Sequence, residues 1–218
     1  MFTDIQDLSA ERVVTIREYI DFISPNIPPP PTTTPRYINT CKGLVFVQLY
    51  GLIEFTVLKT IEKAIFYINV ESLKVSEIRP ILLSLALNAH LDSLQQVNKK
   101  KWDKRYELFK YIEDNKNIII DTILLPTNGE NIQHPQLQSI WNIFCISDPI
   151  YNDIRFQSRL KEIATNRINI AHGNVSASDI GASITITDLK NRLSEVSSFC
   201  SYFINTFETY IKGQNFKS

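Results

Sequence analysis

The sequence predicts an all-α fold: a bundle of about six or seven helices with little or no sheet. The clearest helix lies near the C-terminal end, where Thr185 and Asp188 are spaced for a capping box. Apolar residues then follow at alternating intervals of four and three, as on one face of a helix: Leu189, Leu193, Val196, Cys200, Phe203, Phe207 and Tyr210. An apolar segment from Cys41 to about Asn69 predicts a long central helix. With 218 residues, 44% of them hydrophobic, the chain is long enough for one substantial core.

Shorter apolar patterns predict the rest of the bundle. A helix is expected to begin at Pro80, because proline suits the first helical position. The shorter helices are expected over residues 11–23, 80–94, 106–114, 135–144 and about 152–172. The segment 118–125, which is followed by Pro126, is ambiguous between a strand and an extended connection.

A proline-rich segment from Ser24 to Pro35 interrupts the N-terminal part of the chain. It cannot continue a helix and is expected to be extended. We interpret it as a stiff spacer, although such a run also suits binding to an aromatic-lined groove. The predicted organisation is an N-terminal helical arm with its spacer (1–37), a helical domain (38–213) and a short tail (214–218). The first helix is then a separate arm or lid.

The charges balance, since Lys+Arg and Asp+Glu both number 23. No cationic field surrounds the whole molecule, so any contact with RNA has to rest on a local basic patch. One concentrated basic cluster contains Lys99, Lys100, Lys101, Trp102 and Arg105. It is either a solvated turn between helices or an RNA-binding patch in which the cations contact phosphates and the indole stacks on a base.

The start of the chain, Met1 to Ile5, has neither the basic nor the apolar region of a secretory signal, so a cytoplasmic protein is expected. The most apolar segment, Gly43–Val70, is expected to be a core helix rather than a membrane span. Polar side chains interrupt it at Gln48, Glu54, Lys59, Glu62 and Lys63. Cys41, Cys145 and Cys200 fit neither a disulfide framework nor a zinc site, and we interpret them as buried thiols.

The sequence lacks the usual marks of cofactor chemistry. The three histidines, His90, His134 and His172, are too widely spaced for a paired metal-binding motif. The chain has no Gly-rich phosphate loop, no Gly-x-Ser-x-Gly elbow and no paired-cysteine motif. We therefore expect no metal and no cofactor.

One short segment, Asn166 to Asn174, carries residues that could take part in acid–base chemistry. Arg167 and His172 would lie about 140° apart on a continuing helix, so they would not share a face. Gly173 followed by Asn174 predicts the helix end, which places His172 in the last turn or just beyond it. From spacing alone two interpretations stand: a functional pair, or a histidine that caps the last carbonyls beside a surface arginine.

These residues resemble the HEPN superfamily, named for nucleotide-binding domains of higher eukaryotes and prokaryotes. Its nuclease members are helical bundles that carry Arg, four to six residues and then His, as in Arg167-(four residues)-His172. The pattern Asn-x-Ala-His-Gly at 169–173 is similar to a bacterial ribonuclease and toxin-like branch found in defence loci. The likeness continues at Leu49–Glu54, at Asn128–Ile132 and at the helix start of Thr185. It spans about Cys41–Ile211 and leaves out the N-terminal arm and spacer.

The resemblance implies a metal-independent endoribonuclease. His172 is then the general base or general acid, and Arg167 binds the phosphate, while a 2′-hydroxyl attacks to leave a 2′,3′-cyclic phosphate and a 5′-hydroxyl. Many nuclease members have a polar residue directly after the arginine, whereas this chain has Ile168. The nearest polar residues are Asn166 and Asn169. Asn169 can share a helix face with His172 and is expected to orient its imidazole.

The resemblance also implies a homodimer in which two copies of Arg167 and His172 face each other. RNA is the expected substrate, and a cognate antitoxin or other regulatory protein is a further expected partner. Glu54 is interpreted either as a satisfied structural acid or as a partner of Arg167 or His172. Two other functions stay open: a non-catalytic HEPN module that binds nucleotide, RNA or a partner protein, and a structural or signalling bundle in which the motif is incidental.

Overall fold

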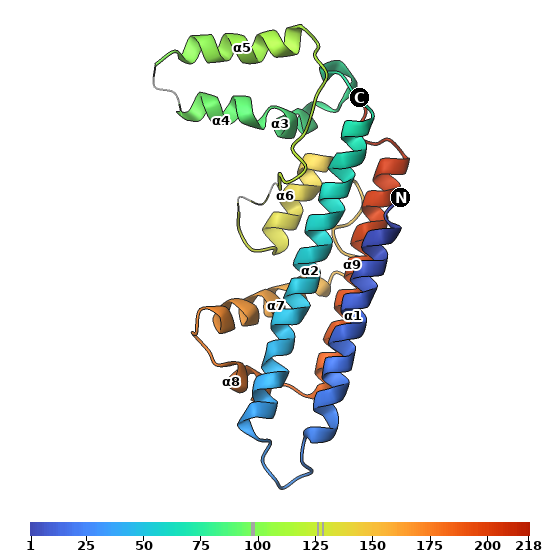
Figure 1. Cartoon of the computed structure of the whole chain (residues 1–218), viewed down its shortest axis with the longest axis vertical. Coiled ribbons are helices and arrows are strands. Elements are labelled where there is room, and N and C mark those ends of the chain that lie inside the picture. The colour runs from blue at the N-terminus through green and yellow to red at the C-terminus, as the bar shows by residue number, and fades with distance from the viewer. Residues whose placement is uncertain (97–98, 126, 128) are drawn as a thin grey trace.

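Three long helices form the body of the molecule: α1 (Thr3–Ile23), α2 (Arg36–Val70) and α9 (Ile186–Lys212) (Figure 1). The computed structural model describes residues 1–96, 99–125, 127 and 129–218. The other α-helices are α3 (Leu83–Ala86), α4 (Asn88–Gln96), α5 (Lys101–Glu113), α6 (His134–Phe144), α7 (Phe156–Ala171) and α8 (Ala177–Ala182). The described residues thus contain nine α-helices and no sheet, which confirms the all-α fold with more helices than the six or seven predicted.

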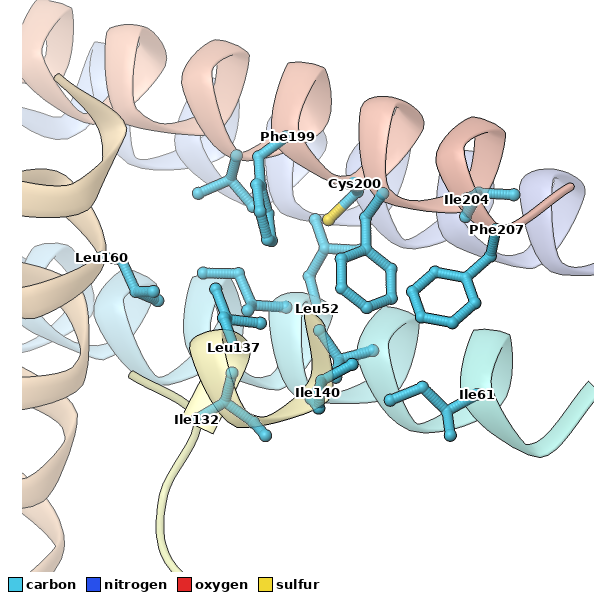
Figure 2. Packing of buried hydrophobic residues seen from close by; sticks show 14 of the residues in the cluster. Leu52, Ile61, Ile132, Leu137, Ile140, Leu160, Phe199, Cys200, Ile204 and Phe207 are labelled. Carbon is cyan, nitrogen blue, oxygen red and sulfur yellow. The ribbon is translucent and has the colours of Figure 1, made fainter. Parts of the chain in front are cut away.

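The C-terminal helix α9 forms as its pattern predicts. Its capping box is present, because Asp188 N donates to Thr185 Oγ1 at 3.1 Å while Thr185 N donates to the Asp188 carboxylate at 3.3 Å. Every residue of the predicted apolar stripe is buried. Figure 2 shows Phe199, Cys200, Ile204 and Phe207 of α9 facing side chains of α2 and α6 across the core.

The central helix α2 begins directly after Pro35 and is longer than the predicted Cys41–Asn69. Of the helices in the described ranges, it is the one long and apolar enough to cross a membrane, with a mean hydropathy of 1.6 over its most apolar window. However, 56% of that window is buried inside the bundle. Helices α1, α7, α8 and α9 pack around it, as expected of a core helix.

The N-terminal helix α1 belongs to the same core, so the prediction of a separate arm is wrong. Its buried residues, Ile5, Val13, Ile16, Ile20 and Ile23, join the cluster formed by α2 and α9. A Ser9–Thr56 hydrogen bond of 3.3 Å and a Lys63–Asp4 ion pair add polar links between α1 and α2. The prolines do end the helix, but the chain then turns back, and the apolar face of α1 packs against its neighbours. The tail is packed too, since Phe216 is buried.

The segment between α2 and α6 differs most from prediction. The single helix expected over 80–94 is divided into a 3₁₀ turn (Pro80–Leu82), α3 and α4, whereas α5 begins earlier than the predicted residue 106. A further 3₁₀ turn spans Val75–Glu77, and another, Ser24–Asn26, follows α1. Helices α4 and α5 form a hairpin that projects from the body (Figure 1).

The ambiguous segment 118–125 forms no sheet strand, and it turns at Asp121, whose carbonyl accepts from Leu124 N at 3.1 Å. Asn69 at the end of α2 holds it, because its side chain donates to the Ile120 carbonyl at 2.7 Å and accepts from the Ile120 N–H at 2.9 Å. Pro126, and Asn128 at the start of the segment similar to HEPN proteins, lie outside the described residues.

Candidate functional site

Arg167 lies on the face of α7 that packs against α2. Phe156, Leu160, Ile163 and Ala164 are the buried residues of α7, and Arg167 continues their helical spacing by one more turn. The side chain is half-buried. Its Nη1 donates to Asn131 Oδ1 at 3.1 Å, and its Cζ lies 4.9 Å from the ring centroid of Tyr50. The guanidinium is therefore oriented by a loop residue and by an aromatic ring of α2.

Tyr50 links these elements. Its hydroxyl accepts a hydrogen bond from Ile132 N at 2.7 Å and makes a long contact of 3.5 Å with Asn131 Oδ1. Burial raises the pKa of Tyr50, the Glu54 carboxylate raises it further, and the Ile132 N–H and Arg167 oppose the rise. The phenol thus stays protonated near neutral pH. We call Tyr50, Asn131 and Arg167 the Arg167 cluster.

His172 is the C-terminal cap of α7, as the helix stop predicted. Gly173 has a φ of +71°, a left-handed conformation that favours glycine. Asn174 N donates to the Asn169 carbonyl at 2.9 Å and Gly173 N to the Ile170 carbonyl at 3.2 Å, which is the Schellman pattern. Because backbone N–H groups satisfy these carbonyls, the imidazole is not needed as their cap. The His172 side chain is exposed to solvent.

The chain after His172 is anchored to α2 through α8. A Cβ placed on Gly43 of α2 would lie 1.9 Å from the carbonyl oxygen of Ala177, and one on Gly181 would lie 1.8 Å from that of Asn39. The two helices therefore approach backbone to backbone, with no room for a methyl group on either glycine. This contact fixes where the turn after His172 runs.

A network of ion pairs fastens α7 to α9 on its other side. Arg192 Nη2 of α9 lies 2.7 Å from Glu162 Oε1 of α7. Arg159 pairs with Glu162 as well and with Glu195 at 2.5 Å. The Arg192 side chain is largely buried, and it also donates to the Asp188 carbonyl. The network therefore holds the orientation of α7, the helix that carries Arg167 and His172.

A family model described as HEPN_MAE_28990-like HEPN matches residues 3–216. The chain belongs to this family. The HEPN match includes α1, in agreement with its packing in the core and beyond the span of Cys41–Ile211 expected from the motifs. No curated protein and no solved structure matches the chain.

The predicted site residues Arg167 and His172 are not joined by a hydrogen bond in the part of the chain that the structure describes. Arg167 faces α2, whereas His172 caps the C-terminal end of α7 and is exposed to solvent. Asn166 and Asn169 are partly exposed on α7, and Asn169 contributes its carbonyl to the helix stop. Its predicted orienting role toward the imidazole stays a prediction.

Glu54 lies one helical turn after Tyr50 on α2 and is partly exposed. Its effect on the Tyr50 pKa places the carboxylate near the Arg167 cluster. No ion pair joins Glu54 to Arg167 or His172 among the residues with described positions. Glu54 therefore lies beside the cluster and does not neutralise Arg167.

The predicted RNA-binding residues lie on another element of this HEPN protein. Lys101, Trp102 and Arg105 belong to the first turns of α5, and Lys99 and Lys100 directly precede it. The basic cluster is thus a helix start on the projecting hairpin rather than a turn alone. The structure does not bring it into contact with Arg167 or His172.

The other histidines and the cysteines have structural surroundings. His134 Nδ1 lies 3.0 Å from the Tyr151 hydroxyl, and His90 packs against the Tyr111 ring. Cys200 is buried, and burial raises its pKa to about 12, whereas Cys41 and Cys145 are partly exposed, which corrects the expectation of three buried thiols. In the described ranges no group of three or more His, Cys, Asp or Glu side chains gathers as a metal site would require.

Sequence reasoning missed Asn131 and Tyr50 as site residues. Both lie in segments that resemble HEPN proteins, Asn128–Ile132 and Leu49–Glu54, so a signal was present. That signal did not identify which side chain in each segment contacts Arg167. Asn131 lies 36 positions and Tyr50 117 positions before Arg167 in the sequence, so no local pattern links them.

Proposed function

We propose that this HEPN protein is a metal-independent endoribonuclease. The observation that carries the proposal is the oriented guanidinium of Arg167, held by Asn131 and Tyr50, five residues before an exposed histidine at a helix end. A half-buried arginine with a purely structural role is commonly paired with a carboxylate. Here its hydrogen-bond partner within the described residues is a neutral amide, so its charge is left for another anion.

Arg167 would bind the scissile phosphate. A guanidinium has five N–H donors, and Asn131 engages one of them. The remaining donors suit a two-pronged contact with phosphate oxygens and stabilise the charge that develops on them in the transition state. Because its other contacts hold the guanidinium in place, little side-chain freedom is lost when the phosphate binds.

His172 would transfer the proton. As general base, it takes the proton of the 2′-hydroxyl while the 2′-oxygen forms a bond to phosphorus and the bond from phosphorus to the 5′-oxygen breaks. The departing 5′-oxygen takes a proton from an acid, so the products are a 2′,3′-cyclic phosphate and a 5′-hydroxyl. DNA lacks the attacking hydroxyl, which makes RNA the substrate.

A second copy of the chain would complete the site by supplying the other acid or base. The α2 face beside the Arg167 cluster suits this role, because Leu44, Val47 and Leu58 are exposed apolar side chains there. Val47 and Glu54 are helical neighbours of Tyr50, on which Arg167 stacks. Packing two such faces together would bring both copies of Arg167 toward the seam and would cover apolar surface.

The test is RNA cleavage by the purified full chain in excess chelator, with the product ends identified. Cyclic phosphate ends are expected from the wild type, and none from Arg167→Ala or His172→Ala. Arg155→Ala is the matched control, since Arg155 is an exposed arginine at the start of the same helix. Cleavage that needs an added divalent ion, or equal activity in all variants, contradicts the proposal.

A second candidate function is a non-catalytic HEPN module that binds RNA, nucleotide or a partner such as a cognate antitoxin. Ile168 favours it, because an apolar side chain stands where many nuclease members carry a polar one. In the same assay this module would bind RNA without producing cyclic phosphate ends.

A further inference from the structure

Helix α5 presents three large aromatic side chains to solvent. Trp102 is 77% exposed, Tyr106 68% and Phe109 66%. Their spacing of four and three places them on one face of the helix. Leu108, the buried residue of α5, lies on a different face, so the aromatic face points away from the element on which α5 packs. Exposed aromatics in such a row are unusual on a protein surface that binds nothing.

The basic residues lie at the same end of the helix as Trp102. Lys99, Lys100, Lys101 and Arg105 have no carboxylate partner within ion-pair distance among the described residues. Arg105 instead covers the Trp102 ring, with its Cζ 4.8 Å from the centroid. The positive end of the helix dipole adds to this charge.

The remaining lysines of α5 are neutralised within the helix. Lys104 pairs with Glu107 at 2.5 Å, and Lys110 pairs with Asp114 at 2.9 Å. The uncompensated charge is therefore concentrated at the N-terminal half of α5, beside the first aromatic ring. A protein partner with an apolar surface would match the aromatics alone, whereas a phosphate chain with exposed bases matches both features.

The hairpin of α4 and α5 projects from the side of the body that also carries α7. Figure 1 shows it leaving the three-helix body on the same side as α7 and α8, but nearer the other end of the molecule. Inside the hairpin, His90 of α4 packs against Tyr111 of α5 at 5.4 Å between ring centroids. This contact keeps α5 paired with α4 while its aromatic face stays open.

We propose that α5 binds single-stranded RNA, with Trp102, Tyr106 and Phe109 stacking on unpaired bases and Lys99, Lys100, Lys101 and Arg105 contacting the backbone. This proposal rests on the proposed function, because RNA bound by α5 would be the substrate that Arg167 and His172 cleave. Duplex RNA keeps its base faces stacked inside the helix, so it offers phosphates but no rings to the aromatic row.

The indole of Trp102 reports on binding directly. The chain has two tryptophans. Trp141 is buried, and its Nε1 donates to the Asp148 carbonyl at 2.8 Å, so a ligand does not reach it. A short oligouridylate titrated into the His172→Ala protein is expected to quench the Trp102 emission, and the same strand annealed to its complement is expected to quench it far less.

Variants then separate stacking from charge. Affinities of these variants are measured by fluorescence anisotropy of a labelled oligouridylate. Tyr106→Ala and Phe109→Ala are each expected to weaken binding by roughly five- to a hundredfold, the usual effect of losing one stacked base. Ile123→Ala, which truncates an exposed apolar residue outside the row, is the matched control. Replacing the four cations with glutamine should lower the slope of log affinity against log salt by about 0.7 for each phosphate that the protein no longer neutralises.

Equal affinity for single strand and duplex, or binding unchanged by Tyr106→Ala and Phe109→Ala, overturns the proposal. The nuclease is judged separately, in the protein with α5 unaltered, by cleavage of a dinucleotide, which offers one scissile phosphate. Binding without any cleavage contradicts the nuclease proposal but not RNA binding by α5. Cleavage without oligouridylate binding contradicts only RNA binding by α5.

Discussion

Arg167 Nη1 of α7 donates a hydrogen bond of 3.1 Å to Oδ1 of Asn131, in the loop that precedes α6. The amide oxygen accepts from the guanidinium without neutralising it. Asn131 thus sets the direction of the arginine while its positive charge stays available, which is the arrangement a phosphate-binding arginine requires.

Asn131→Ala removes this acceptor and frees the guanidinium to rotate. We expect RNA cleavage to fall by about ten- to a hundredfold, as for other small displacements of a binding group. The unfolding temperature should stay close to that of the wild type, because Asn131 is partly exposed. Gln138→Ala, at an exposed amide of α6, is the control. Unchanged cleavage by Asn131→Ala would show that Arg167 is positioned without it.

Tyr50→Phe keeps the ring beneath Arg167 and removes the acceptor of the Ile132 N–H. A buried N–H left without a partner costs roughly 1–3 kcal/mol. Denaturant unfolding should therefore show a loss of stability in this range. Stability equal to that of the wild type would mean that the 2.7 Å hydrogen bond does not hold the loop.

Gly43→Ala and Gly181→Ala are expected to destabilise the protein strongly, because each new Cβ would lie within 2 Å of a backbone oxygen of the facing helix. Gly51→Ala is the matched control on α2, since its Cβ meets nothing within 4 Å. Alanine there should raise stability by up to about 1 kcal/mol in a helix interior. Thermal unfolding of the three variants tests the difference, and equal midpoints would contradict the close approach of α8.

Gly51 also tests the proposed dimer. Gly51→Trp places a large ring on the α2 face, at a position where the new Cβ meets nothing within 4 Å, and thermal unfolding checks that the single chain still folds. Light scattering should show a dimer for the wild type and a monomer for this variant, with cleavage lost in parallel. Phe22→Arg, at an exposed site of α1, should leave both unchanged. A wild-type monomer that cleaves RNA fully would refute the shared site.

His172→Ala and Arg167→Ala should differ in stability but not in cleavage. Each is expected to lower cleavage by about two to four orders of magnitude. His172 is exposed, so its variant should unfold like the wild type, whereas Arg167→Ala also removes the packing of the guanidinium over the Tyr50 ring and should unfold somewhat earlier. If His172→Ala unfolds as severely as a core truncation while its folded fraction still cleaves, the histidine is structural.

Periodic patterns were sufficient to predict α9, α6 and the middle of α2, because one continuous apolar face determines such helices locally. They were insufficient for α1. The prolines that follow it suggested an arm separate from the bundle, whereas the isoleucines of α1 pack into the common core. The short helix α8 was missed because its placement depends on a backbone contact with Gly43, far away in the sequence.

The candidate site was predictable where its causes are local. The end of α7 at Gly173 and the position of His172 follow from a few adjacent residues. The partners of Arg167 do not, since Tyr50 lies within an apolar helix and resembles an ordinary core residue until the fold brings α7 against it. Long-range packing, which no local pattern reports, completes the Arg167 cluster.

The pairing of the first and last helices has a consequence for synthesis. Because α1 covers its apolar side with α9 as well as α2, the core cannot close until α9 has left the ribosome. A nascent chain then carries Arg167 and His172 before it has a completed bundle to hold α7. The cleavage proposed above would therefore be absent until α9 has emerged and packed against α1 and α2.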